Sequence, residues 1–454
     1  MNKTRQVLDL LRDYESRNVT FIEPLGSWPI VWERAKGVHV WDGSGKKYLD
    51  LTAAFGVAAA GHANPRVVRA GQRQMARLLH AMGDVHPHAL KAELAKELSR
   101  ITFERWSRKS RGQSPKAKVA TGKVIFCNSG FEAVEAALKT ALLATGKRGV
   151  IAFEGAYHGL GYGALNVTQR EHFRGPFRSQ LREFGHFVPF PVAADVSRLK
   201  AKSKRRNEPT HVGCHEVEQR IRKILRREEV GAILVEPIQG RGGIRVPPLE
   251  FLPSLRKLCD EHGALLILDE IYTGFGRTGK WFACEHSGVV PDVICLGKAL
   301  TGGFPLSACV GRAKVMDAAW PPAAGEAIHT STFLGHPVGC AMALAQIAEI
   351  RRRGLCRRSA QLGALLLRAL DRVHASRLTL HARGLGLMAG LELRNNDDSP
   401  AMDEALRVIK AMLRRGFILL PEGEHSNVIS FTPPLTISAA QLGRTLGALE
   451  ETLR

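Results

Sequence analysis

Short runs that are almost entirely apolar alternate with longer amphipathic segments through the middle of the chain, and no other feature of the sequence restricts the fold as much. The runs are residues 123–127, 149–153, 230–235, 264–268 and 293–296. Short continuous apolar runs are typical of parallel strands that are buried on both faces of a sheet. The intervening segments, among them 132–145 and 215–227, have the pattern of helices. This alternation predicts an α/β domain with a mainly parallel central sheet.

The two ends of the chain have a different pattern. Residues 38–51 contain two short strand-like stretches around Asp-Gly-Ser-Gly, which is a hairpin signal. After Pro321-Pro322, helical and strand-like patterns mix: the helical ones are 339–352, 402–415 and 439–453, and the strand-like ones are 386–393 and 428–431. A chain of 454 residues is long enough for two domains. We therefore predict a large domain, residues 61–322, and a smaller α+β domain assembled from residues 1–60 and 323–454.

The chain carries a formal net charge of +22, and much of this excess is local. Residues 104–123 and 198–206 are basic, polar and aperiodic, which predicts exposed, mobile loops. A basic surface also attracts nucleic acid, so a nucleic-acid-binding protein is the remote alternative to an enzyme. Aromatic residues do not alternate with the basic ones, as a groove for single-stranded nucleic acid requires. A solvated surface is the favoured interpretation.

Other features bear on the location of the protein. The sequence contains no run of about 18 apolar residues, so no membrane span is expected. Residues 1–18 lack the continuous apolar stretch of a secretory signal. The eight cysteines occur singly, with no Cys-x-x-Cys pair. Single cysteines inside apolar runs suit buried thiols in a reducing compartment. We expect a cytoplasmic protein that does not contact membranes.

Chemically active residues follow the apolar runs, at the point where each predicted strand ends. In chain order they are Ser129-Gly130, Tyr157-His158, Glu236, Asp269-Glu270 and Lys298. In open parallel sheets, ligands bind beyond the carboxyl ends of the strands. Gly130 also lies at the start of a predicted helix, where backbone N–H groups suit a phosphate. The sequence thus predicts a site at one edge of the sheet.

This combination of residues matches the requirements of pyridoxal phosphate. A lysine amine forms an imine with the aldehyde of the cofactor and later moves protons. A carboxylate keeps the pyridine nitrogen protonated, an aromatic ring stacks on the cofactor, and backbone amides hold its phosphate. No metal is expected in such a site.

Residues 266–311 (LILDEIYTGFGRTGKWFACEHSGVVPDVICLGKALTGGFPLSACVG) resemble the signature of class-III, or ω-type, pyridoxal-phosphate-dependent aminotransferases. The resemblance covers nearly the whole chain. It extends to Gly61-His62, Asn128-Ser129-Gly130, Tyr157-His158-Gly159, Glu236-Pro237-Ile238-Gln239-Gly240, Ser331-Thr332-Phe333 and Arg383-Gly384. It implies the aspartate-aminotransferase-like fold, which is fold type I of the pyridoxal-phosphate enzymes.

The resemblance also implies roles for individual residues. Lys298 matches the Schiff-base lysine, and Asp269 matches the partner of the pyridine nitrogen. The remaining matches are Tyr157 and Ile271 on the two faces of the cofactor ring, and Ser129, Gly130 and Phe131 at its phosphate. Thr332 resembles a residue that reaches the phosphate of a neighbouring subunit, which implies a homodimer with shared active sites.

Several of these positions have a second interpretation. His158 either contacts the cofactor or is a structural histidine, and Glu236 either lines the site or is hydrogen-bonded scaffolding. Thr332 also suits a helix cap. Residues 82–86 either line the pocket of the partner subunit or form an ordinary loop.

The chain departs from the family at positions that hold the substrate. Phe131 and Tyr272 replace a hydroxyl residue and a glutamine, and the phenol of Tyr272 is still expected to reach the cofactor. Ser430 and Leu160 stand where relatives carry arginines that bind carboxylates. Arg241 stands where the family commonly has a glutamate. We hypothesise that the Arg241 guanidinium binds the substrate carboxylate instead.

The predicted reaction is ping-pong transamination. An amine or amino acid donates its amino group, and an oxo acid or aldehyde accepts it. A racemase, aminomutase or lyase is the alternative, because the same scaffold hosts several reactions. A transaminase bleaches the cofactor's absorption band when donor is added alone, whereas a racemase does not.

Overall fold

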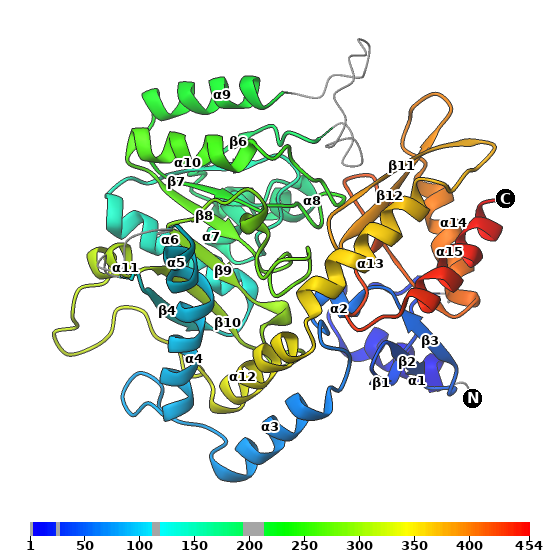
Figure 1. Ribbon diagram of the computed structural model, residues 1–454, viewed down its shortest axis with the longest axis horizontal. Helices are drawn as coiled ribbons and strands as arrows, with labels where there is room; N and C mark the ends of the chain where they lie inside the picture. Colours follow the sequence, from blue (N-terminus) through cyan, green and yellow to red (C-terminus); the bar gives the residue numbers. More distant parts are fainter. Residues whose placement is uncertain (1–2, 24–27, 111–118, 194–212) are drawn as a thin grey trace.

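The computed structural model describes residues 3–23, 28–110, 119–193 and 213–454. A seven-stranded sheet with the order β4-β10-β9-β8-β7-β5-β6 forms its centre (Figure 1). The strands are β4 (Gly122–Cys127), β5 (Gly149–Phe153), β6 (Gly185–Val188), β7 (Val230–Val235), β8 (Leu265–Asp269), β9 (Val293–Leu296) and β10 (Ser307–Arg312). Strands β5 to β9 pair in parallel, and β10 runs antiparallel to β4 and β9. The predicted α/β fold with a mainly parallel sheet is confirmed.

The sheet is covered on both faces, as the apolar runs predict. In β7, Ala232 and Leu234 pack on one side with α6 (Gly130–Thr145). Ile233 and Val235 pack on the other side with α9 (Cys214–Arg227) and α10 (Phe251–His262). Every residue of β7 is buried for this reason.

Two strands of the large sheet were not predicted. In β6, three of the four residues are only partly buried, so the edge strand has no continuous apolar run. In β10, small and polar residues (Ser307, Gly311 and Arg312) interrupt the pattern. Neither strand carries the signal that marks a strand buried in the middle of a sheet.

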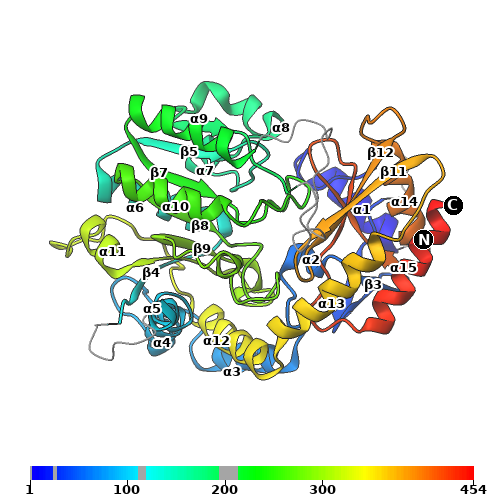
Figure 2. The same cartoon turned by 45° about the horizontal axis from the view of Figure 1, so that its top comes forward.

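The second part of the molecule is built from both chain ends and lies to the right in Figure 2. One sheet has the order β1-β2-β3-β13, and another has the order β11-β12-β15-β14. The strands are β1 (Trp32–Lys36), β2 (His39–Asp42), β3 (Lys47–Asp50), β11 (Leu378–Gly384), β12 (Ala389–Asn395), β13 (Phe417–Ile418), β14 (Leu420–Glu422) and β15 (Val428–Phe431). β2 and β3 form the predicted hairpin, and Phe417 pairs in parallel with Leu49 of β3. This pairing joins the C-terminal segment to the N-terminal one.

Helices complete both parts. Near the ends of the chain are α1 (Lys3–Tyr14), α13 (Leu355–Leu370), α14 (Met402–Arg414) and α15 (Ala439–Leu453). The others are α2 (Ala53–Gly56), α3 (Pro65–Arg77), α4 (Ala89–Ser99), α5 (Arg105–Ser110), α7 (Tyr162–Val167), α8 (Glu171–Arg174), α11 (Ala313–Ala319) and α12 (Pro337–Arg352). Among the described helices, none has the length and apolar character that crossing a membrane requires.

The prediction of a loop over the basic stretch 104–123 was wrong at both ends, since residues 122 and 123 belong to β4. Residues 105–110 form α5 rather than a loop. Trp106 is only 5% exposed, because its ring packs edge-on against Phe103 and Phe282 at centroid distances of 5.3 and 5.7 Å. One buried tryptophan therefore anchors this basic segment to the core. Residues 111–118 and the whole of the second basic stretch, 198–206, lie outside the described residues.

Candidate active site

Asp269 ends β8 and makes the best-defined polar contact of the site. Its Oδ2 lies 2.8 Å from Nδ1 of His158, and its Oδ1 accepts a hydrogen bond from the N–H of Ile271 at 3.1 Å. Asp269 and His158 are both buried. His158 is held in turn, because its backbone N–H donates to Thr168 Oγ1 at 2.9 Å. The carboxylate is therefore fixed in position before any ligand binds.

Glu270, the next residue, was expected at the same edge of the sheet but is used differently. Its carboxylate accepts hydrogen bonds from Thr273 Oγ1 at 2.5 Å and from the N–H groups of Ala283 and Cys284, both at 2.8 Å. Side chains alternate in direction along an extended chain. Of the two adjacent acids, Glu270 organises the segment after β8 and Asp269 belongs to the site.

Lys298 follows β9 in a turn that is tightly constrained. Its backbone has a φ of 37°, which is unusual for a residue with a side chain. Its Nζ lies 4.3 Å from the centre of the Tyr272 ring. Burial lowers the pKa of Lys298, and the charges of Asp269 and Glu236 offset part of this effect. A lowered pKa increases the fraction of neutral, nucleophilic amine near neutral pH.

Glu236 directly follows β7 and connects two loops of the site by hydrogen bonds. It accepts hydrogen bonds from the N–H groups of Tyr157, at 3.1 Å, and Gly240, at 3.0 Å. Burial raises its pKa to about 7. Its hydrogen bonds are those of a scaffolding residue, and its charge raises the pKa of Lys298.

The N-terminus of α6 has the features of an anion site. Ser129 is the N-cap residue, but its hydroxyl makes no capping hydrogen bond, and its Oγ is buried without a partner among the described residues. Ser307 Oγ donates to the Ser129 carbonyl at 2.5 Å and fixes this turn. Backbone N–H groups at a helix start, with a free hydroxyl beside them, suit a phosphate. A Cβ on Gly130 would lie 3.1 Å from Ile271 Cδ1, so the turn is closely packed.

The predicted ring-binding residues lie in the surrounding loops. Tyr157 is partly buried, and its ring packs edge-on against Phe173 at 5.4 Å. Ile271 lies between Gly130 and Gly297, and a Cβ on Gly297 would be 3.3 Å from Ile271 Cγ2. Phe131 packs on Gly159, which has a φ of 113° and no room for a side chain.

The Tyr272 hydroxyl has a partner within the chain. It lies 3.1 Å from Thr432 Oγ1, so the phenol is engaged by the C-terminal part of the chain. The ring is held between Gly56 and Gly240, where added Cβ atoms would approach it to 2.6 and 2.4 Å. Burial raises the pKa of Tyr272 to about 12, which keeps it neutral. It is the face of the ring, not the hydroxyl, that Lys298 Nζ contacts.

Arg241 pairs with a residue that sequence reasoning missed. Its Nη1 lies 3.5 Å from Oε2 of Glu422, the last residue of β14, and its guanidinium lies 5.9 Å from the centre of the Tyr157 ring. Glu422 is 2% exposed. Burial raises its pKa to about 7, although the charges of Arg241 and Lys298 act in the opposite direction. A three-residue strand far along the chain gives no signal that its last residue faces this site.

Three other predicted positions lie apart from this group. Ser430 Oγ donates to the Leu420 carbonyl at 3.1 Å, and Leu160 is exposed. Thr332 is also exposed, and within the described part of the chain it makes no hydrogen bond to the residues named above. Its segment lies against residues 82–86, where Thr330 Oγ1 donates to Asp84 Oδ2 at 2.6 Å.

The arrangement fits pyridoxal phosphate. An unpartnered hydroxyl and free amides at the start of α6 suit its phosphate, and a fixed carboxylate suits its ring nitrogen. Lys298 supplies a partly buried amine of lowered pKa. His158 Nε2 is buried without a partner in the described residues, while its Nδ1 faces Asp269. Among the described residues, Asp269 is thus the polar partner of the His158 ring.

The sequence is similar to known aminotransferases over almost its whole length. The family model for class-III aminotransferases matches residues 23–453. A 5-aminovalerate aminotransferase of Pseudomonas aeruginosa is 35% identical over 93% of this chain and 93% of its own. A putrescine aminotransferase of Pectobacterium atrosepticum is 36% identical over 99% of this chain and 89% of its own. An acetylornithine aminotransferase of Methanopyrus kandleri is 37% identical over 94% and 95%.

Solved structures give the same result. A transaminase from the marine bacterium Virgibacillus superposes with a TM-score of 0.84 at 25% identity, covering 99% of this chain and 98% of that one. An amine transaminase from an uncultivated Pseudomonas species, solved with pyridoxal phosphate bound, has a TM-score of 0.83 at 27% identity and covers 97% and 98%.

Proposed function

The chain belongs to the class-III aminotransferases, and we propose that it carries out their pyridoxal-phosphate-dependent transamination with Lys298 and Asp269 as its catalytic residues. The fold is that of the fold type I transaminases. The enzyme transfers an amino group between an amine or amino acid donor and an oxo acid or aldehyde acceptor. The contact between His158 and Asp269, facing the same site as a partly buried lysine of lowered pKa, is the observation that carries the assignment of residues.

The cofactor, when bound, supplies an aldehyde that takes up the amino group and a ring that withdraws electrons from the reacting carbon. Asp269 would hold the ring nitrogen, and its negative charge would keep that nitrogen protonated. Ser129, with the N–H groups of Gly130 and Phe131, would hold the phosphate. Tyr157 and Ile271 would pack on the two faces of the ring.

Lys298 also moves the proton. Its neutral Nζ accepts a proton from the carbon of the donor that bears the reacting amino group, and it later gives up this proton within the same complex. Burial favours this role because it lowers the pKa of Lys298 toward neutrality. Glu236 lies within electrostatic reach and adjusts that pKa. The face of Tyr272 limits where Nζ can move.

Arg241 and Tyr272 form the substrate side of the proposal. Arg241 lies on the loop after β7, beside Tyr157, and is partly exposed. A guanidinium there is placed to bind a carboxylate of the donor or acceptor. Replacing Arg241 with Ala should raise KM for carboxylate substrates by about 10- to 100-fold. Amines that lack a carboxylate are the control, and their KM should change little.

We also propose that two copies pair, with Thr332 reaching the phosphate site of the partner. Residues 82–86 and 328–335 contact each other and present exposed apolar side chains, among them Met82, Val85 and Phe333. Clustered exposed apolar side chains are typical of interfaces. Light scattering should give twice the mass of the chain. Thr332→Ala should weaken cofactor binding about tenfold.

The same proposal includes the domain boundaries and a cytoplasmic location. The pairing of β13 with β3 supports a small domain made from residues 1–60 and 323–454 around a large domain of residues 61–322. Eight free cysteines, most of them buried, suit a reducing compartment.

A half-reaction tests the function. The cofactor-loaded enzyme, given an amino donor alone, should release one equivalent of oxo product and retain the amino group on the cofactor. A racemase or lyase would leave the cofactor spectrum unchanged after product formation.

A further inference from the structure

Among the described residues, Glu422 is a buried ionisable group that the proposed function does not use. It is 2% exposed, and neither oxygen of its carboxylate accepts a hydrogen bond from the described residues. The nearest cation is Arg241 Nη1 at 3.5 Å, which is long for a charge-assisted hydrogen bond. A buried carboxylate without hydrogen bonds is costly. Such a group is retained where a ligand completes its contacts.

The surroundings of Glu422 are those of a binding site. The charges of Arg241, Lys298 and Arg170 all act on its carboxyl, so it lies within electrostatic reach of the catalytic amine. The guanidinium of Arg170 lies 5.3 Å from the Phe173 ring and has no hydrogen bond or ion pair among the described residues. The face of the Tyr272 ring contacts Lys298 Nζ, and the charge of Glu422 contributes to the raised pKa of Tyr272.

Backbone contacts hold the segments that carry Arg241 and Glu422 together. Gly423 N–H donates to the Arg241 carbonyl at 3.1 Å, so the residue after Glu422 is bonded to Arg241 itself. A Cβ on Gly243 would lie 3.2 Å from Gly423 Cα, so the two loops are in close contact. The backbones of the two loops are therefore in close contact, although the Arg241 and Glu422 side chains approach only to 3.5 Å.

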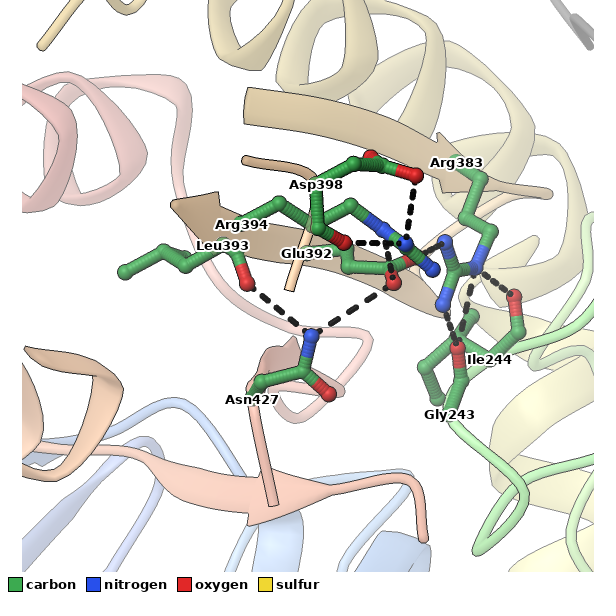
Figure 3. Close-up of polar contacts among 8 residues, drawn as sticks. All are labelled: Gly243, Ile244, Arg383, Glu392, Leu393, Arg394, Asp398 and Asn427. Atoms are coloured by element: carbon green, nitrogen blue, oxygen red, sulfur yellow. Dashed lines mark hydrogen bonds and ion pairs between the residues drawn. The ribbon is translucent and has the colours of Figure 1, made fainter. Parts of the chain in front are cut away.

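Arg383 fixes the same loop from the small-domain sheet (Figure 3). Its Nε donates to the carbonyls of Gly243 and Ile244 at 3.0 and 3.1 Å, and its Nη2 donates to Gly243 O at 2.7 Å. Its Nη1 pairs with Glu392. Burial raises the pKa of Glu392, but the charges of Arg383 and Arg394 outweigh this and hold it at about 2. Glu392 therefore stays ionised near neutral pH, and its ion pair with Arg383 persists. We call Arg383 and its contacts with Glu392, Gly243 and Ile244 the clamp.

We propose that Glu422 and Arg241 together bind the amino-acid end of the donor, Glu422 taking an ammonium that does not react and Arg241 the neighbouring carboxylate. The preferred donor is then a diamino acid whose second amine reaches Lys298. This inference rests on the proposed transamination and names its substrate class. Adjacent opposite charges on the protein match the adjacent ammonium and carboxylate of an amino acid. A donor that has a carboxylate but no second ammonium leaves Glu422 without a partner, and a diamine leaves Arg241 without one.

Matched donors test the proposal. For α,ω-diamino acids of several chain lengths, kcat/KM is compared with that of the ω-amino acid that lacks the α-ammonium and the diamine that lacks the carboxylate. The wild-type enzyme should prefer the best diamino acid over both by at least about tenfold. Glu422→Gln keeps the shape and removes the charge. It should lower the ratio of diamino acid to ω-amino acid by about 10- to 100-fold.

Glu424→Gln is the control, because Glu424 carries the same charge two residues further on but is exposed; it should leave the ratio unchanged. A second readout avoids turnover altogether. By calorimetry on the cofactor-free Lys298→Ala chain, the diamino acid should bind more tightly than the ω-amino acid. Adding Glu422→Gln should remove that difference. If Glu422→Gln does not fold, the proposal is tested by the donor preferences of the wild-type enzyme and by Glu422→Asp. The latter shifts the carboxylate and should reduce the ratio of diamino acid to ω-amino acid.

Equal kcat/KM values for matched donors, or an equal loss for all donors in Glu422→Gln, would overturn this inference and leave transamination intact. Absence of amino transfer from every donor would instead overturn the proposed function.

Discussion

The two ends of the candidate site are built in opposite ways. At the cofactor end, Asp269, His158 and Glu236 are buried and hydrogen-bonded, and the Asp269–His158 contact measures 2.8 Å. At the substrate end, Arg241 and Glu422 approach only to 3.5 Å, and the Glu422 carboxylate has no hydrogen bond among the described residues. At the first end the carboxylates are held by hydrogen bonds within the protein, whereas at the second the Glu422 carboxylate is left for a ligand to satisfy. The protein alone therefore positions the residues at the cofactor end, whereas the preference among substrates depends on the contacts that a substrate makes with Arg241 and Glu422.

The largest effect should come from removing the amine of the cofactor end. Lys298→Ala should lower kcat by at least about 10⁴-fold, because it removes both the covalent anchor and the base. Steady-state assays with the best donor measure the loss. Lys257→Ala is a suitable control, since Lys257 is an exposed lysine on α10. A Lys298→Ala enzyme that keeps a tenth of its activity would rule out this role.

Asp269→Asn should be next, with a loss of about 10²- to 10³-fold in the half-reaction rate, because the charge that protonates the ring nitrogen is gone. The adjacent acid sharpens the comparison. Glu270→Gln should lower the stability by about 1–3 kcal/mol, through its three hydrogen bonds, and change turnover far less. Single-turnover kinetics and thermal unfolding separate the two effects. The same loss of rate in both variants would contradict the division of roles.

The substrate end should respond to pH, because Glu422 titrates near neutral pH. The pKa of Glu422 is raised to about 7 by burial, so its carboxylate is charged above that pH and neutral below it. The preference for a diamino acid over the matched ω-amino acid should fall as pH drops below about 7, by about tenfold per unit at most. Arg241, Arg170 and Lys298 face Glu422, and they lower this pKa somewhat. Glu236 titrates in the same range but affects all donors alike, so it cancels in the ratio. A ratio that is constant between pH 6 and 8 would contradict the assignment.

The smallest effect should come from the clamp behind the substrate end. Arg383→Ala removes three hydrogen bonds to the carbonyls of Gly243 and Ile244, so the loop that carries Arg241 should loosen. KM for carboxylate substrates should rise about three- to tenfold, and kcat should change less. A change in kcat alone would place Arg383 in a different role.

The same contrast explains what could be predicted from the sequence. Residues that follow buried parallel strands meet at one edge of the sheet, so the positions of Ser129, Glu236, Asp269 and Lys298 could be inferred from short apolar runs. The structure adds that Glu270 turns away and that His158 supports Asp269. Both facts depend on side-chain direction, which the pattern of apolar residues does not specify.

The substrate end was only half predicted. Arg241 could be singled out by its departure from the family, but its partner could not. Glu422 lies on a three-residue strand, and its approach to Arg241 depends on how the C-terminal sheet packs against the loop after β7. Trp106 was missed for a similar reason, because a single apolar residue among basic ones gives no periodic signal. Long-range packing decides both cases.

The central claim is that Lys298 is the residue that binds the cofactor covalently. Reduction of the cofactor-loaded enzyme with borohydride, followed by peptide mass mapping, tests it without any substrate. The account predicts a single phosphopyridoxyl label on Lys298. A label on another lysine, or none on a protein that has bound the cofactor, would contradict it.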